Sequence, residues 1–433
     1  FFFIFLFSIR IFRNHQRELI IFFSLFFYSF WNPIFIFLIF FYLFFGYFFI
    51  KNSISLRVSI PTILLPLFYF KYSLFFSNIF DFKLLVSKSY TGSLPLAISF
   101  ITFTVIAILI DIKTKRFNEK INFFSFTEFI IYFPQLIAGP ILRANELIPI
   151  LKEKIIFKNE NIKFGISLFI LGFVKKIFFA DSIATYIDPI FENPSLVDPG
   201  DHFKAFLLFP LQIYFDFSGY VDMALGVSKI LSINLPINFN RPYLSISLTE
   251  FWRNWHITLS KWFRDYVYIP LGGSQTSNNK LFLNLIFTMS IAGLWHGASL
   301  NFILWGVLNG IVLFIEKKIS CYFNLNKYIK IFFTCFIVFN LWIVFRIENL
   351  SLMYDFYTYL YLDFFKSLNV NNAILFLITL LAIYSQKYDN FKYIENFSRK
   401  IKFSFLIPIL VLIILTGLAL NTGTSEKFIY FNF

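Results

Sequence analysis

The stretch "LFLNLIFTMSIAGLWHGASLNFILWGVLNGIVLFI", residues 281–315, contains no Asp, Glu, Lys or Arg over 35 residues. A helix that spans a membrane needs about 20 predominantly apolar residues. The run is therefore longer than one span and barely long enough for two. Four glycines, at positions 293, 297, 306 and 310, permit either close helix packing or a break. This stretch predicts a chain that folds in lipid.

The composition of the whole chain agrees with this prediction. The 433 residues are 58% hydrophobic and 14% charged, whereas a soluble domain carries about 25% charged residues. The formal net charge is +14, but the basic residues lie between apolar runs, which favours anionic lipid head groups over nucleic acid as partners. With two cysteines, neither a disulfide framework nor a cysteine metal site is expected.

Apolar segments recur along the entire sequence. We expect an all-α polytopic membrane protein with about 9–11 transmembrane helices and additional re-entrant pieces. No repeat and no soluble domain is visible, so residues 1–433 are predicted to form a single membrane-embedded domain. The candidate spans and half-spans are 19–30, 34–50, 54–70, 94–112, 121–138, 162–180, 203–215, 217–233, 281–295, 298–315, 329–346, 372–385 and 403–420.

The basic clusters suggest an orientation for these segments. The positive-inside rule predicts a cytoplasmic location for the Lys and Arg residues within 10–17, 113–120, 152–158 and 387–402. Two of these clusters flank the segment 121–138, which contains Pro134. A segment with both ends on one side must be re-entrant or broken, and such backbone persists only beside protein or a water-filled cavity. A polar cavity is therefore expected.

A second unusual stretch, "FWRNWHITLSKWF" at residues 251–263, concentrates tryptophans and polar residues. Placed on a helix at 100° per residue, its large apolar side chains fall within an arc of about 120°. The pattern predicts an amphipathic helix at the membrane interface. His256 lies at the edge of the apolar arc, where it could face a cavity wall or simply form a hydrogen bond with a neighbour.

The histidines are the candidate chemical groups. The chain has four, and His296 lies in the middle of the uncharged run. An ionisable residue at membrane depth indicates a functional site, although a core histidine bonded to a carbonyl is the alternative. Zinc requires three or four ligands, and no cysteine or carboxylate lies close to His296 in the sequence, so no metal is expected. An imidazole, with an unperturbed pKa of about 6.5, is suited to act as a base.

A third apolar run contains charged residues that are further candidates for a buried polar site. Asp216 and Asp222 lie in "YFDFSGYVDM", and Arg241 follows in "FNRPYLS" as a potential counter-ion. Structural pairing of these charges is favoured over a direct part in chemistry.

Taken together, these motifs resemble the membrane-bound O-acyltransferase family, and within it the branch of the alginate O-acetyltransferase membrane subunit. The similarity covers nearly the whole chain and is most specific in a motif core at 211–310. The stretches that carry it are "YFDFSGYVDMALG", "NFNRPYLSISLTEFWRNWHITLSKWFRDYVYIPLGG", "SIAGLWHGASLNFILWG", "IYFPQLIAGPILR", "SFWNPIFI" and the closing "FIYFNF".

The resemblance implies a multi-helix bundle around a central tunnel and transfer of an acyl group to a hydroxyl. The family's two functional histidines correspond to His256 and His296. On this basis His296 is expected to be the general base, and His256 to orient the donor or stabilise the oxyanion. One departure is Asn309 in "WGVLNG", at a position where family members often have histidine. We expect a structural role for it.

Further residues of the motif core are expected to shape the tunnel. Trp255 and Trp295 would exclude water, and Asn254 would form a hydrogen bond with the donor. Arg241 and Asp216 complete the expected substrate region.

The resemblance also implies a bound thioester as donor substrate, acetyl-CoA or an acyl carrier, and no bound cofactor. The expected setting is the bacterial cytoplasmic (inner) membrane, with a periplasmic acetyltransferase as partner and an extracytoplasmic polysaccharide, such as alginate, as acceptor. Peptidoglycan or another envelope glycan is the alternative acceptor. Secondary transporters also have broken helices and intramembrane polar groups, and a non-catalytic scaffold is a third possibility. A lipid-linked glycosyltransferase would need acidic clusters, which no loop provides.

Overall fold

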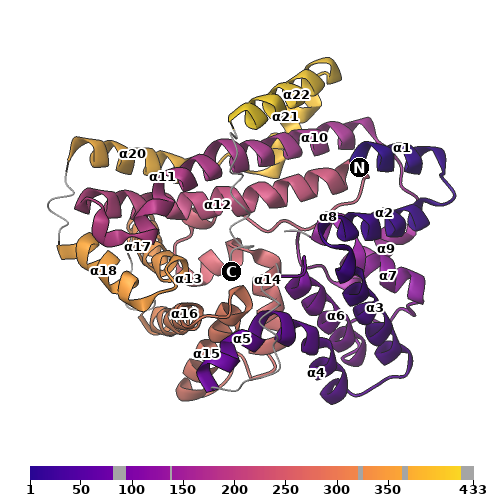
Figure 1. The fold of residues 1–433 in the computed structure, drawn as a ribbon, viewed down its shortest axis with the longest axis horizontal. Helices are drawn as coiled ribbons and strands as arrows, with labels where there is room; N and C mark the ends of the chain where they lie inside the picture. The colour runs from indigo at the N-terminus through magenta and orange to yellow at the C-terminus, as the bar shows by residue number, and fades with distance from the viewer. Residues whose placement is uncertain (81–93, 137–138, 320–324, 363–368, 421–433) are drawn as a thin grey trace. The chain divides into compact units, whose positions relative to one another are not determined.

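The computed structural model describes residues 1–80, 94–136, 139–319, 325–362 and 369–420. The secondary structure of these residues is helical, without strands (Figure 1), which confirms the all-α prediction. Cys321 and the closing motif at 428–433 lie outside them. The chain forms two compact units: unit 1 comprises Phe1–Gly165 and Ala224–Pro236, and unit 2 comprises Ile166–Met223 and Ile237–Phe433. That residues 1–433 form a single membrane-embedded domain stays a prediction.

Unit 1 is built from the N-terminal helices. In chain order these are α1 (Phe2–Ile11), α2 (Gln16–Trp31), η1 (Pro33–Phe35), α3 (Ile36–Lys51), α4 (Leu56–Leu67), η2 (Phe68–Tyr72), α5 (Ser73–Phe80), α6 (Ile98–Lys113), α7 (Phe123–Ile131), α8 (Phe133–Leu136), α9 (Ala144–Lys152) and the start of α10 (Asn159–Val174). Its central element is α6, whose side chains are buried on nearly all sides and which packs against α3 and α4.

The segment 121–138 has the break that the sequence predicts. Helix α7 ends at Ile131, Tyr132 leaves the helical conformation, and α8 begins at Phe133. The side chains around this break are buried. Tyr132 shares a hydrogen bond of 2.9 Å with Ser228, and Gln135 Nε2 donates to the Phe129 carbonyl at 2.7 Å. Protein groups thus satisfy polar atoms near the broken backbone, as burial requires.

Unit 2 contains the motif core. After the end of α10 come η3 (Lys175–Ala180), α11 (Asp181–Glu192), η4 (Pro194–Leu196), α12 (Pro199–Ile230), η5 (Pro242–Leu244), α13 (Leu248–Asn254), α14 (Ile257–Phe263), η6 (Arg264–Tyr268), α15 (Asn278–His296), α16 (Leu300–Ile319), α17 (Lys327–Arg346), α18 (Leu350–Leu362), α20 (Val370–Ser385), α21 (Phe391–Lys400) and α22 (Phe403–Leu420). The last residues of α12 belong to unit 1.

Helix α12 corrects one expectation. The segments 203–215 and 217–233 are not separate, because α12 continues through 32 residues from Pro199 to Ile230. Gly219 does not end the helix. It allows α10 to approach, since a Cβ atom at this position would lie 2.7 Å from the Gly172 carbonyl oxygen. The glycine that sequence patterns associate with a break is here a contact between two helices.

Helices α15 and α16 form a tight hairpin (Figure 1) that holds His296 at the end of its first helix. A Cβ atom at Gly293 would lie 2.0 Å from the Phe302 carbonyl oxygen, and one at Gly306 would lie 2.3 Å from that of Met289. Only glycine permits this approach of two helix backbones. The uncharged run therefore forms two closely packed helices, with the turn at Gly297 immediately after His296.

Three helices within the described parts of the chain are long and apolar enough to span a membrane: Pro33–Lys51, Leu56–Ser77 and Lys327–Arg346. A fourth span is obtained if α21 and α22, bent by 119° at a short break, are counted as one. The chain is a polytopic membrane protein, while the predicted 9–11 crossings remain a prediction.

Candidate active site

The tryptophan stretch is not one continuous helix, which corrects the sequence analysis. Helix α13 ends at Asn254, and α14 begins at Ile257. Between them, His256 adopts the left-handed conformation, with φ 42° and ψ 55°. A residue other than glycine is costly there unless its surroundings hold it in place. A 100° periodicity could not reveal this break, because Trp255 and Trp262 are buried on either side of it.

The segment around Asn238 holds the break in place. The carbonyl of Asn238 accepts from the Ile257 N–H at 3.0 Å. The side-chain oxygen of Asn238 accepts from the N–H and the hydroxyl of Thr258, at 3.1 and 2.7 Å. On the other side, the Asn240 N–H donates to the carbonyl of Asn254 at 3.0 Å. These bonds fix the backbone before and after His256, so its strained conformation is well determined.

The ring of His256 lies in an apolar environment and is 1% exposed. Its centroid is 4.7 Å from that of Phe217 on α12 and 5.9 Å from that of Trp295 on α15. Burial lowers the pKa of His256 from 6.5 to about 3, because a charged imidazolium loses its hydration there. His256 is therefore a neutral imidazole at physiological pH.

His296 is enclosed by rings from three helices. Its ring centroid lies 4.9 Å from that of Trp295, 5.5 Å from that of Trp305 on α16 and 5.1 Å from that of Phe345 on α17. The residue is 6% exposed. Trp295 contacts both imidazoles, so the structure brings the two predicted histidines together across one indole. We call these two histidines with Phe217, Trp295, Trp305 and Phe345 the aromatic enclosure.

Trp255 contacts the aromatic enclosure indirectly, through Trp342. It is 1% exposed, and its ring lies 4.9 Å from that of Trp342 on α17 and 5.0 Å from that of Phe239. Trp342 in turn stacks on Trp305, with centroids 6.0 Å apart and planes 20° apart. The predicted role of Trp255 as a wall of a substrate tunnel stays a prediction.

The side chain of Asn309 ties α13 to α16. The indole N–H of Trp252 donates to Asn309 Oδ1 at 3.2 Å, and Asn309 Nδ2 donates to the Trp305 carbonyl at 2.8 Å. Asn309 is fully buried. One acceptor and one donor are thus used at this position, and a neutral histidine also offers one of each.

A second buried polar group in unit 2 consists of charges, which we call the charge cluster. The ammonium of Lys175 lies 2.6 Å from one carboxylate oxygen each of Asp222 and Asp389. The ammonium of Lys176 lies 2.6 Å from Asp181 and from Asp216. Both lysines occupy η3, a π-helical segment, and π-helices are often found at functional sites.

Asp216 and Asp222 form ion pairs with other residues than the sequence suggested. Their ion pairs are with Lys175 and Lys176, whereas the sequence offered Arg241. Two adjacent lysines within the apolar segment 162–180 were a signal that could have revealed them. Asp389 could not be found this way, because it is 167 residues beyond Asp222. The charge and hydrogen bond of Lys175, with a hydrogen bond from Tyr214, hold the pKa of Asp389 below its usual value, although burial acts to raise it.

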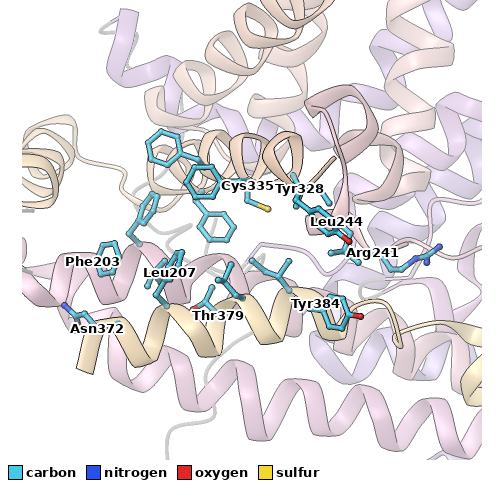
Figure 2. Close-up of a pocket in the computed structure, with 18 of the residues that line it drawn as sticks. Phe203, Leu207, Arg241, Leu244, Tyr328, Cys335, Asn372, Thr379 and Tyr384 are labelled. Carbon is cyan, nitrogen blue, oxygen red and sulfur yellow. The ribbon is translucent and has the colours of Figure 1, made fainter. Parts of the chain in front are cut away.

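A cavity of about 1400 Å³ lies between α12, α13, α17 and α20 in unit 2 (Figure 2). Of the predicted site residues, Arg241 and Asn254 line it. Asn254 donates to the Ser245 hydroxyl at 3.1 Å, and Arg241 Nε donates to Asn240 Oδ1 at 3.3 Å. Neither His256 nor His296 is among the lining residues. This cavity and the candidate catalytic groups are therefore different places, and we assign chemistry to the histidines.

No group of three or more His, Cys, Asp or Glu side chains suited to hold a metal ion occurs within the described ranges.

Comparison with known proteins gives consistent matches. The profile of the membrane-bound O-acyltransferase family matches residues 112–356. A probable alginate O-acetylase of Pseudomonas aeruginosa, AlgI, is 40% identical over 268 residues, 61% of this chain and 51% of that protein. A peptidoglycan O-acetyltransferase of Helicobacter pylori is 35% identical over 373 residues, 76% of this chain and 70% of that protein.

A teichoic acid D-alanyltransferase of Bacillus subtilis is 29% identical over 251 residues, 54% of this chain and 60% of that protein. The chain spans about half the length of the probable alginate O-acetylases it matches.

Proposed function

Because the chain belongs to the membrane-bound O-acyltransferase family, we propose that it moves an acetyl group from a cytoplasmic thioester toward hydroxyls of an extracytoplasmic polysaccharide. Acetyl-CoA or an acyl carrier would supply the thioester. The observation that carries this proposal is the pair of buried imidazoles, His256 and His296, on either side of Trp295.

His296 is the proposed general base. A free hydroxyl is a weak nucleophile, so its proton must leave as its oxygen attacks the thioester carbonyl. The imidazole of His296 would accept that proton and return it to the departing thiolate, which leaves the histidine unchanged. The rings of Trp295, Trp305 and Phe345 around His296 support this role, since exclusion of water limits hydrolysis of the thioester.

His256 is the proposed orienting group. Its low pKa keeps it neutral, and a neutral imidazole can donate one hydrogen bond to a carbonyl oxygen that becomes negative during attack. The bonds from Asn238 around the break would hold this donor in a fixed direction. Asn254, Trp255, Arg241 and Asp216 remain proposed substrate-region residues, of which Asn254 would contact the donor.

The first candidate acceptor is an exopolysaccharide of the alginate type, because relatives named alginate O-acetylase are 40% identical to this chain. The second is peptidoglycan, because the Helicobacter pylori peptidoglycan O-acetyltransferase aligns over more of the chain, 76%. Both acceptors present sugar hydroxyls outside the cytoplasmic membrane, in which we place the protein. A periplasmic acetyltransferase would complete delivery to the polymer.

The test is base-releasable acetate on purified exopolysaccharide and on purified peptidoglycan. Cells would carry the unmodified chain or His296→Ala at equal membrane levels. A matched control is His202→Gln, since His202 is also a buried histidine of unit 2 but contacts Phe356, Tyr359 and the Pro194 carbonyl. We expect acetate to be lost from one polymer only in His296→Ala, which would also identify the acceptor. Equal acetate in all three strains would contradict the proposed function.

A further inference from the structure

The cavity in unit 2 is basic at one end. Arg241, Lys327 and Lys387 line it, against a single acidic residue, Glu250. Figure 2 shows Arg241, Tyr328 and Tyr384 at one end and Asn372 and Phe203 at the other. Lys327 adjoins Tyr328, and Lys387 lies less than one helical turn from Tyr384. The positive charges therefore gather at the end where α17 begins and α20 finishes.

The remainder of the cavity is apolar. Its walls are mainly aromatic and aliphatic side chains, among them Phe203, Phe206, Phe332, Phe336, Phe339 and Phe376. Along α17 the wall runs from Tyr328 to Phe339, about 16 Å at 1.5 Å per residue. At the end away from the positive charges, Asn369 and Asn372 line the cavity, so no charge opposes the basic end there.

One wall of the cavity belongs to a helix suited to span a membrane. Helix α17 is one of the helices long and apolar enough to cross the bilayer. Its wall residues Tyr328, Phe332 and Phe336 are 77%, 54% and 43% exposed. Because Lys327 begins this helix, the basic end lies where a span meets the head-group region, and the apolar walls extend from there to hydrocarbon depth.

We propose that this cavity binds an anionic phospholipid. The phosphate would lie among Arg241, Lys327 and Lys387, and the acyl chains would lie against α17 and α20. Charge complementarity selects the anionic head group, and the long apolar wall matches acyl chains. Neither His256 nor His296 lines the cavity, whereas Arg241 and Asn254, which the proposed function places in the substrate region, do line it. The test measures lipid binding and does not depend on acyl transfer.

The first experiment uses the purified full chain in nanodiscs. Phosphatidylglycerol or phosphatidylcholine with a photoreactive group in the acyl chain would be cross-linked, and labelled peptides identified by mass spectrometry. We expect phosphatidylglycerol to label α17 and α20. In Lys327→Gln/Lys387→Gln, labelling affinity should fall about twentyfold, because each lysine near an anionic surface contributes roughly a fivefold factor. The matched control, Lys330→Gln/Lys392→Gln, changes two nearby lysines that do not line the cavity.

A second variant pair tests the apolar part. Ala373 lines the cavity from α20, whereas Leu377 on the same helix does not and is 58% exposed. Ala373→Trp should reduce phosphatidylglycerol labelling of α17 and α20 by at least tenfold, and Leu377→Trp should not. Equal labelling by the two lipids, or equal labelling of the two tryptophan variants, would overturn the proposal. Unaltered lipid binding by Ala373→Trp together with loss of a partner protein would assign the cavity to a partner's helix instead.

Discussion

Two regions of unit 2 bury ionisable side chains in different ways. In the charge cluster, each lysine ammonium has two carboxylates at 2.6 Å. In the aromatic enclosure, both histidines are surrounded by rings. A buried charge must be paired or it destabilises the fold, whereas an imidazole can be neutral and remain able to exchange a proton. The difference separates groups that hold the structure together from groups suited to chemistry.

The largest effect is expected from breaking the charge cluster. Lys175→Met leaves the carboxylates of Asp222 and Asp389 buried without their shared cation. Removing one partner of a buried ion pair costs about 3–5 kcal/mol, so the folded protein should be lost from the membrane. Membrane levels and the thermal aggregation midpoint in detergent would measure this. Lys204→Met, which affects a partly exposed pair with Asp201, is the control and should change the level little.

Replacing the two carboxylates that lose their cation with neutral amides gives a stricter test of the charge cluster. Lys175→Met/Asp222→Asn/Asp389→Asn removes the uncompensated charges, so much of the lost stability should return. If Lys175→Met alone were as stable as the unmodified protein, the cluster would not be a structural element.

The opposite result is expected in the aromatic enclosure. His256→Asn should lower acetyl transfer about 100-fold, a typical loss for one group that stabilises developing charge, while membrane levels stay near normal. Asparagine suits this position because it tolerates the left-handed conformation that His256 adopts. Acetate release per unit of membrane protein would be measured. Normal acetylation with reduced protein levels would make His256 a structural residue like the lysines of the cluster.

Some features of these two regions and of their helices could be predicted from the sequence, and others could not. The uncharged run 281–315 predicted membrane helices, and its glycines correctly indicated close packing. A broken or re-entrant segment at 121–138 was predicted because basic clusters flank it, and the structure has the break at Tyr132. The break at His256 was missed, since it depends on hydrogen bonds from Asn238, which lies before α13 in the chain.

The candidate site likewise contains residues that the sequence identified and contacts that it could not. The resemblance supplied His256 and His296, and the structure places both against Trp295. Periodicity could not supply the partner of Lys175, because Asp389 comes from a turn far along the chain. Local patterns identify which residues are unusual, while long-range contacts decide which of them are paired.

An intermediate effect is expected at Asn309, which links α13 to the wall of the enclosure. Asn309→Leu leaves the Trp252 indole N–H without its acceptor and removes the side-chain hydrogen bond to the Trp305 carbonyl, which keeps its helical backbone bond. A buried donor without a partner costs about 1–3 kcal/mol. Asn309→His, which also offers one donor and one acceptor, should keep both contacts and stay within about 0.5 kcal/mol of the unmodified protein. Unfolding midpoints in detergent would compare them. Equal destabilisation by both changes would contradict the assigned contacts.

The smallest effect concerns pH and distinguishes the enclosure from the cluster most directly. The pKa of His256 is lowered to about 3 in the folded protein from 6.5, so between these values the unfolded chain binds a proton that the folded chain does not. Stability from this group is complete well above pH 6.5 and is lost progressively as the pH falls through 6.5 toward about 3. Between pH 8 and pH 6 the unmodified protein should lose about 0.8 kcal/mol that His256→Asn does not lose. The free energy of unfolding of both proteins, measured in mixed detergent at each pH, would show the difference. An identical pH dependence would mean that His256 is hydrated in the folded protein, and the enclosure would then lack the dry, neutral imidazole on which its contrast with the paired charges depends.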